Sequence, residues 1–369
     1  MRELTVEEIP WIAEGATVLG AGGGGSAYQG GLMLRRHMRL GARVVLLDSD
    51  ELPDHARGPV LLGMGAPTVG IERVQPTGRW RGVVEGVRAA VGRLDFLAIG
   101  EIGGGNGLAP LVAAAETGLS VVDADPMGRA FPELQMHTYS IGGIVPAPLL
   151  LCDGKGVLAS LAGVPDTVTG ERYARALAWA MGGSASVAMG IVTAADVRRL
   201  GIRGTLSLAQ RIGQAMTAAR RSKRPAVEAI LAVVPTGRHL FEGKIVDVER
   251  RTAAGFARGA VTVDGLDADR GARMRIEFQN EYLIARRDGE ALLTVPDLLV
   301  LVERETGRAL GSEAVRYGLR VSVLGLPAPH ELKTSAALAV VGPRAFGYDD
   351  AFRPLPGDLL GRAAPAPAL

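Results

Sequence analysis

The first half of the chain alternates short apolar runs with longer segments in which apolar residues recur at helical spacing. The apolar runs predict strands, and the periodic segments predict helices. The expected strands are residues 16–20, 42–48, 59–64, 96–100 and 120–123, and the expected helices are residues 5–15, 27–40, 80–91 and 108–117. Strands that alternate with helices indicate an α/β domain whose mostly parallel sheet is covered on both faces.

The pattern changes near residue 165. Beyond it the chain is first mainly helical, and from about residue 237 it becomes rich in short strands separated by turn residues. The expected helices are residues 171–181, 194–200 and 206–221, and the expected strands are residues 184–193, 244–250, 259–263, 273–280, 282–286, 298–303 and 319–324. Such closely spaced strands are typical of a sandwich or barrel. We therefore expect an α/β domain over residues 1–165, a β-rich C-terminal domain over 166–350 and a flexible tail over 351–369.

The composition is that of an ordinary globular protein, with 47% hydrophobic and 22% charged residues among 369. The net charge of +2 does not favour nucleic acid as a partner, and no apolar run is long enough to span a bilayer. A single cysteine, Cys152, excludes an internal disulfide and favours a reducing compartment. Because the first residues do not resemble a signal peptide, we expect a cytoplasmic protein.

An acidic segment at residues 121–135 carries the strongest chemical signal. Asp123 and Asp125 end an apolar run, and side chains two positions apart on a strand point to the same side. Two adjacent carboxylates need a cation, a shared proton or a partner such as Arg129 to offset their repulsion. We therefore predict Asp123, Asp125, Arg129 and Glu133 as catalytic residues. The alternative is a solvated turn held by an Asp–Arg pair.

Two glycine-rich loops point to a ligand at the same edge of the sheet. Residues 20–25 satisfy G-x-G-x-x-G between an expected strand and helix, and Asp48 ends the next strand, which is the context of a dinucleotide fingerprint. Residues 101–107 also follow a strand, and open α/β sheets bind ligands at the carboxyl ends of their strands. The predicted substrate contacts from these loops are Gly22, Gly23, Gly24, Glu101, Gly104 and Asn106. Tight packing between neighbouring units is the alternative interpretation.

The second half adds polar residues that we expect at the domain interface, where ligand pockets are common. These predicted substrate contacts are Asn280, Glu281 and Arg344. The five histidines show no self-contained zinc motif. Asp123, Asp125 and His137 could still supply mixed oxygen and nitrogen ligands to a divalent metal such as zinc, and a cleft without a metal is the alternative.

Taken together, these motifs resemble the S-methyl thiohydantoin desulfurase family. Residues 20–26, 101–107 and 121–135 resemble its N-terminal domain, and residues 241–245, 278–282, 295–298, 316–318 and 342–348 resemble its C-terminal domain. The resemblance covers about residues 6–348 and implies hydrolytic loss of methanethiol from a methylated thiohydantoin ring. Because the family often occurs beside or fused to hydantoinase/oxoprolinase proteins, the resemblance also implies such a subunit as a partner.

We therefore predict a hydrolase-like enzyme that acts on a small cyclic amide, hydantoin or S-methyl thiohydantoin. Water would attack an sp² ring carbon, with Asp125 or Glu133 as the general base, and Arg129 with the glycine-loop N–H groups would stabilise the developing negative charge. We expect a homo-oligomer. Two other interpretations remain open: a non-catalytic partner of an ATP-dependent hydantoinase, and a dinucleotide-binding oxidoreductase.

Overall fold

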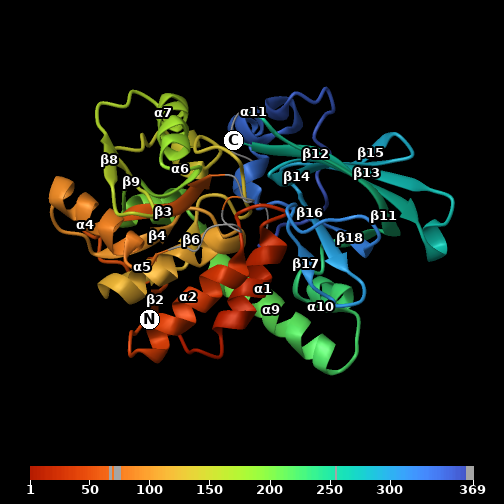
Figure 1. Ribbon diagram of the computed structural model, residues 1–369, viewed down its shortest axis with the longest axis horizontal. Helices are drawn as coiled ribbons and strands as arrows, with labels where there is room; N and C mark the ends of the chain where they lie inside the picture. The colour runs from red at the N-terminus through yellow and green to blue at the C-terminus, as the bar shows by residue number, and fades with distance from the viewer. Residues whose placement is uncertain (66–68, 70–75, 254–255, 363–369) are drawn as a thin grey trace.

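The computed structural model describes residues 1–65, 69, 76–253 and 256–362. Two eight-stranded sheets lie side by side, one built from the first half of the chain and one from the second (Figure 1). Helices α1 and α9 lie near the junction between the two sheets (Figure 1). The part of the predicted tail at residues 363–369 lies outside the described residues.

The first sheet confirms the predicted α/β class. Its strands follow the order β1-β2-β5-β4-β3-β9-β7-β8, and β2, β5, β4 and β3 are parallel to one another while the remaining pairs are antiparallel. The strands are β1 (Arg2–Glu3), β2 (Val45–Leu47), β3 (Arg57–Gly65), β4 (Phe96–Ile99), β5 (Ser120–Val122), β7 (Leu149–Cys152), β8 (Leu158–Leu161) and β9 (Ser184–Thr193). A separate two-stranded pair joins β6 (Ala124–Asp125) to β10 (Ile202–Arg203).

Helices cover both faces of this sheet. Alternate residues of β4 explain why, since Leu97 and Ile99 pack into one apolar core while Phe96 and Ala98 pack into another. The helices in the described part of the whole chain, in sequence order, are α1 (Ile9–Leu19), α2 (Ala27–Arg39), α4 (Arg79–Val91), α5 (Ala109–Thr117), α6 (Thr138–Ile141), α7 (Thr167–Ala180), α8 (Ala194–Leu200), α9 (Thr205–Arg221), α10 (Ala226–Val233) and α11 (Ser335–Val341). Short 3₁₀ turns are η1 (Ser49–Glu51), η2 (Gly104–Gly107), η3 (Asp267–Asp269), η4 (His330–Lys333) and η5 (Pro343–Phe346).

The strand predicted at residues 16–20 is wrong, because α1 continues through them to Leu19. The reason is visible in the burial pattern. Ile12, Ala16 and Leu19 recur at spacings of four and three and all face the core, which is the periodicity of a helix rather than of a strand. The first glycine loop therefore connects two helices, α1 and α2, and does not follow a strand.

Glycines allow α1 and α9 to cross in close contact. A Cβ atom on Gly15 of α1 would collide with the backbone of Ala209, and one on Gly213 of α9 would collide with the backbone of Trp11. The two contacts are reciprocal, so each helix contributes a glycine against the other helix's main chain. This crossing holds α9, which begins after residue 200, against the first helix of the chain.

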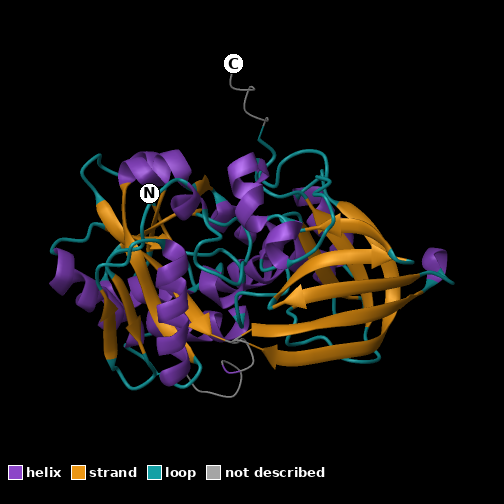
Figure 2. Ribbon diagram, turned by 90° about the horizontal axis from the view of Figure 1, so that it is seen from above, coloured by secondary structure: helices purple, strands orange, loops and turns teal. Residues whose placement is uncertain are grey.

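The second sheet confirms the β-rich C-terminal domain as one curved antiparallel sheet (Figure 2). Its order is β15-β14-β13-β12-β11-β18-β16-β17, and β14 also contacts β16, so the two halves of the sheet approach each other. The strands are β11 (Arg238–Ala253), β12 (Phe256–Gly265), β13 (Arg273–Gln279), β14 (Glu281–Arg287), β15 (Glu290–Thr294), β16 (Leu298–Glu303), β17 (Ala309–Leu310) and β18 (Arg320–Leu326).

The two halves of the chain are interleaved. Strand β9, which comes after residue 166, lies between β3 and β7 of the first sheet. Conversely, Val300 and Leu324 of the second sheet share one apolar core with residues of α1, α9 and α10. None of the helices in the described part of the chain has the length and apolar character needed to cross a membrane.

Candidate active site

A cleft lies where the carboxyl ends of the parallel strands meet the second sheet. Its volume is about 150 Å³, a size that accommodates a benzene-sized molecule. The end of β3, the loop after β4 and the acidic segment after β6 form one wall, and the turn between β13 and β14 forms another. Predicted site residues that line it are Gly24, Glu101, Asn106, Glu133, Asn280 and Glu281.

Two buried glutamates from the two domains dominate the cleft. Glu101 is 3% exposed and Glu281 is 2% exposed, and the charge of Glu101 acts on Glu281. Burial raises the pKa of Glu101 to about 8. Burial, followed by the neighbouring Glu101, raises the pKa of Glu281 well above its ordinary value. At neutral pH at least part of this pair is therefore protonated, and Oε2 of Glu281 has no hydrogen-bond partner within the described residues.

Asn106 fixes the orientation of Glu101. Its Nδ2 donates to Oε1 of Glu101 at 3.0 Å and to the carbonyl of Gly63 at 3.2 Å, while its Oδ1 accepts from the Gly63 N–H at 2.8 Å. The other carboxyl oxygen of Glu101 accepts from the N–H of Phe131 at 3.2 Å. The amide of Asn106 thus ties the loop after β4 to the end of β3 and holds the carboxyl in place.

Arg129, predicted as a catalytic residue, is fully buried and joins the two domains. Its guanidinium donates to the carbonyls of Tyr282 at 3.0 Å, Pro296 at 3.1 Å and Asp297 at 2.9 Å, and Nε donates to the carbonyl of Ala130. Burial lowers the pKa of Arg129 to about 10, which leaves it charged at neutral pH. Arg129 does not line the cleft among the described residues, so the geometry assigns it to domain packing beside the glutamate pair.

Asp125 is also fully buried and holds the loops that form the cleft. Its Oδ2 accepts from the N–H groups of Ile102 at 3.1 Å, Met127 at 3.0 Å and Gly128 at 2.9 Å. Burial raises the pKa of Asp125 to about 7. Because Ile102 follows Glu101 directly, this carboxyl positions the loop that carries Glu101, although Asp125 itself is not among the described residues that line the cleft.

Asp123 caps a helix. Its carboxylate accepts from the N–H of Leu206 at 2.8 Å and from the N–H and hydroxyl of Ser207, at the first turn of α9. Negative charge suits a helix N-terminus. Asp123 and Asp125 therefore bind different segments, and their carboxylates share no hydrogen-bond partner among the described residues.

The first glycine loop is packed between protein groups. A Cβ atom on Gly22 would collide with the ring of Tyr282, one on Gly23 with the carboxyl of Glu281, and one on Gly24 with the backbone of Gly103. The loop is also bonded to the second sheet, since the N–H of Tyr282 donates to the carbonyl of Ala21 at 2.7 Å. The two glycine loops bond to each other as well, so tight packing, the alternative interpretation, describes Gly22, Gly23 and Gly104.

The half-buried end of the same loop lines the cleft. In the part of the chain that the structure describes, the backbone N–H groups of Gly24 and Gly25 have no hydrogen-bond partner. Helix α2 begins directly after them, with the Ser26 hydroxyl accepting from the N–H of Gln29 at 3.3 Å. Free N–H groups at a helix N-terminus favour developing negative charge.

The dinucleotide context is not present. The G-x-G-x-x-G run follows α1 instead of a strand. Asp48, which would bind a ribose in that motif, accepts from the N–H of Asp50 at 3.0 Å and caps η1. The structure therefore removes the strand that the fingerprint requires before the glycine run, and it gives Asp48, which directly follows β2, a capping role.

The remaining predicted contacts separate into two groups. Glu133 lines the cleft and is bonded to the amide of Gln135. Asn280 adopts a positive φ of 59°, and its Oδ1 accepts from the N–H of Ala257 at 2.9 Å, so it shapes the turn that presents Glu281. Arg344, by contrast, is exposed on η5 and does not line the cleft among the described residues.

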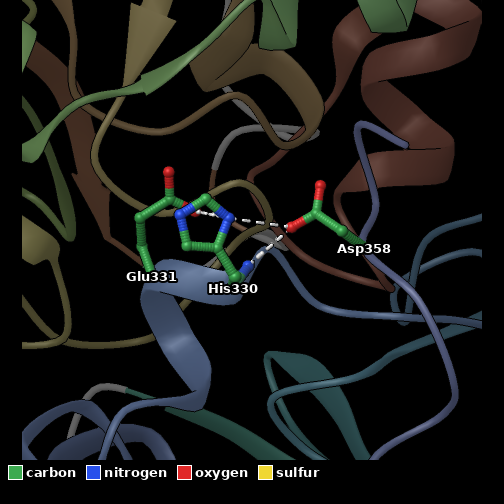
Figure 3. A group of neighbouring side chains, drawn as sticks. All are labelled: His330, Glu331 and Asp358. Carbon is green, nitrogen blue, oxygen red and sulfur yellow. Dashed lines mark hydrogen bonds and ion pairs between the residues drawn. The ribbon is translucent and has the colours of Figure 1, made fainter. Parts of the chain in front are cut away.

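The predicted metal ligands do not converge. His137 is buried at the N-terminus of α6, where its Nδ1 accepts from the N–H of Ser140 at 3.0 Å, and burial lowers its pKa to about 3. Among the described residues, the one group of three ligand side chains within metal-binding distance is His330, Glu331 and Asp358 (Figure 3). Arg362 neutralises that group through two bonds to Glu331 at 2.8 and 2.7 Å, so it holds the C-terminal segment and offers no set of free ligands.

Sequence reasoning missed several residues that line the cleft. Leu62 and Met64 lie at the carboxyl end of β3, inside the strand predicted at residues 59–64, so the argument from strand ends that located Glu101 applies to them as well. Arg79 and Trp80 of α4 and Arg175 of α7 also line the cleft, but no local motif marks them, because only the tertiary fold brings these helices to the sheet edge.

The fold and the site define a two-domain α/β protein with a carboxyl-lined cleft at the domain junction. The chain matches the S-Me-THD-like N-terminal domain over residues 7–162 and the S-Me-THD-like C-terminal domain over residues 165–355. It belongs to the S-Me-THD-like family, as its motifs predicted.

A solved structure shows the same fold. The X-ray crystal structure of a protein from Chromobacterium violaceum superimposes with a TM-score of 0.79 at 24% sequence identity, covering 96% of this chain and 100% of that chain. At this identity the likeness supports the fold alone. No curated protein matches the chain.

Proposed function

We propose that this protein is a hydrolase that removes methanethiol from a small S-methyl thiohydantoin-type ring. The observation that carries the proposal is the pair of buried carboxyl groups, Glu101 and Glu281, which face one ring-sized cleft from two domains. The family assignment supplies the thiohydantoin chemistry.

Two interacting carboxyl groups with raised pKa values suit general acid–base chemistry. Their environment keeps a proton on the pair at neutral pH, so one group can accept a proton while the other donates one. In the proposed reaction, the ionised carboxylate takes a proton from water, whose oxygen bonds to the ring carbon that carries the S-methyl group. The carbon–sulfur bond then breaks, and the protonated carboxyl gives its proton to the leaving methanethiolate. The products are the oxygen-containing ring and methanethiol.

Other groups around the cleft have positioning roles in this proposal. Gly24 and Gly25 line the cleft, and in the proposed reaction their N–H groups stabilise negative charge on the ring during water attack. Asn106 and Asp125 act through Glu101, since one orients its carboxyl and the other holds its loop. In this proposal the glutamate pair takes the role of general base that the sequence analysis gave to Asp125 or Glu133.

The test is release of methanethiol from an S-methyl thiohydantoin, measured with a thiol reagent. Glu101→Gln keeps the shape and the Asn106 contact but removes the exchangeable proton, so we expect kcat to fall by about 100-fold or more. Glu85→Gln, on the surface of α4, is the matched control and should retain full activity. Absence of methanethiol release by the unaltered protein, or an unchanged kcat in a folded Glu101→Gln variant, would reject the proposal.

A further inference from the structure

A second hollow opens beside the cleft, along one face of α7. Its volume is about 670 Å³, within the usual range of small-molecule pockets. Val168, Arg172, Ala176 and Trp179 line it, and their spacing of four, four and three places them on one side of the helix. Phe256, at the start of β12, contributes from the second sheet.

The groove and the cleft adjoin each other. Gly65, Glu133 and Arg175 line both of them. A ring held against Glu101 therefore has a path for a substituent that leads past Glu133 and onto the face of α7. This shared wall indicates what occupies the groove, because a molecule held in the cleft lies next to it.

The chemistry of the groove favours an uncharged substituent. The carboxylate of Glu171 is paired with Arg175, and it also accepts from the N–H of Leu134 at 3.1 Å. Arg175 in turn lies over the ring of Phe256 at 4.2 Å, and Arg172 lies over Tyr173 at 5.1 Å. With Glu171 and Arg175 paired to each other, much of the surface that remains for a ligand is aliphatic and aromatic, beside the exposed Arg172.

The exposure of these apolar side chains needs an explanation. Trp179 is 68% exposed and Val168 is 60% exposed, although both lie beside a pocket that reaches a buried carboxyl group. When a ligand covers a large exposed aromatic side chain, apolar surface is removed from water and binding is stabilised. Tyr173, on the same helix and 51% exposed, does not line the groove among the described residues and so offers an internal comparison.

We propose that the groove binds an apolar, aromatic-sized substituent of the ring whose reacting carbon lies between Glu101 and Glu281. This inference rests on the proposed function and specifies its substrate class: a thiohydantoin-type ring that carries a benzyl-like group. Trp179 and Phe256 are the specificity-determining residues, and neither takes part in the chemical step.

The experiment compares three S-methyl thiohydantoins that carry no substituent, a benzyl group or a carboxymethyl group. For the unaltered protein we expect the benzyl compound to have a KM about tenfold below that of the unsubstituted ring, the size of one good apolar contact. Trp179→Ala should remove most of this advantage while leaving kcat and KM for the unsubstituted ring unchanged. Tyr173→Ala should keep the advantage.

The outcomes separate this inference from the proposed function. Turnover of all three rings without a benzyl preference, or with a preference for the carboxymethyl ring, overturns the groove assignment and leaves the hydrolase proposal standing. If no ring is turned over, calorimetric binding of benzyl-substituted and unsubstituted hydantoins tests the groove assignment independently of turnover. Tighter binding of the benzyl compound that Trp179→Ala abolishes supports the groove, and equal binding overturns it.

Discussion

The glutamate pair shows how two domains create a property that neither has alone. Glu101 comes from the loop after β4, and Glu281 begins β14 of the other sheet. Burial raises the pKa of each, the charge of Glu101 raises the pKa of Glu281 further, and the charge of Asp125 raises that of Glu101. Arg129 lies beside them with much of its hydrogen-bonding capacity used on backbone carbonyls, so its charge moderates the repulsion without removing it.

This arrangement predicts how stability depends on pH. The pKa of Glu101 rises from an ordinary 4.5 to about 8 on folding, so between these values the folded state binds more protons than the unfolded chain. The contribution of neutral Glu101 is therefore fully present below 4.5 and is lost as the pH rises through about 8. We expect Glu101→Gln to lose less unfolding free energy over this window than the unaltered protein, as measured by urea denaturation at a series of pH values.

The control for that measurement is Glu85→Gln, which changes an exposed glutamate on α4. Its stability should follow the unaltered protein at every pH. The Glu101→Gln curve should be flatter without being level, because Asp125 and Glu281 also have raised pKa values. Parallel curves for all three proteins would mean that Glu101 ionises as readily in the folded state as in the unfolded one.

For single residues, the sequence predicts which ones lie in or beside the site better than it predicts the role of each one. Asp125 and Arg129, both predicted as catalytic residues, are fully buried, but their hydrogen-bond partners are distant in sequence. Arg129 bonds to Pro296, 167 positions away, and Asp125 to Ile102, 23 positions away. No spacing rule connects such pairs, so the sequence could not separate a catalytic role from a positioning one.

Among the elements, the parallel strands were the most predictable. Helices α4 and α5 separate β3, β4 and β5, and the carboxyl ends of the parallel strands meet at one edge, which is where the cleft lies. Helix α1 was the least predictable boundary, because its last turn is as apolar as a buried strand. Short apolar runs carry no period that separates the two structures, so the glycine loop after α1 was placed at the correct edge from an incorrect preceding element.

At the crossing of α1 and α9, helix propensity and packing predict stability changes of opposite sign for the same substitution. Propensity alone would make Gly213→Ala more stable by about 1 kcal/mol. Since the new Cβ atom would collide with the Trp11 carbonyl, we expect net destabilisation of about 1–3 kcal/mol as the helices separate. Gly82→Ala on α4 is the matched control, because its Cβ would meet only Cys152 Sγ at an ordinary 3.5 Å. Thermal denaturation should show opposite shifts, and a stabilised Gly213→Ala protein would contradict the close crossing.

At the scale of the whole molecule, the two sheets share a core. Ile12 of α1, Ile212 of α9 and Ile230 of α10 pack in the same apolar cluster as Val300 and Leu324 of the second sheet. The alternation of strands and helices predicted two domains, but it could not predict this sharing. The apolar face of each helix is visible in sequence, whereas the element that covers it is decided by the tertiary fold.

The shared core predicts one cooperative unfolding transition, although multidomain proteins commonly show more than one. The three tryptophans, at residues 11, 80 and 179, report on the first half by fluorescence, while far-UV circular dichroism also reports on the second sheet. We expect the two signals to give the same midpoint in urea. Leu324→Ala, a truncation in the second sheet, should destabilise the protein by about 2–5 kcal/mol and move the tryptophan signal equally.

The equal shift of the two signals is the decisive result, because the tryptophans lie in the first half of the chain while the cavity lies in the second sheet. If the halves were independent, Leu324→Ala would shift the circular dichroism signal and leave the tryptophan transition in place. Such a separation would also weaken the account of the cleft, since Glu101 and Glu281 hold their raised pKa values only while both domains stay closed around them. A coincident shift therefore links the shared core to the chemistry of the cleft.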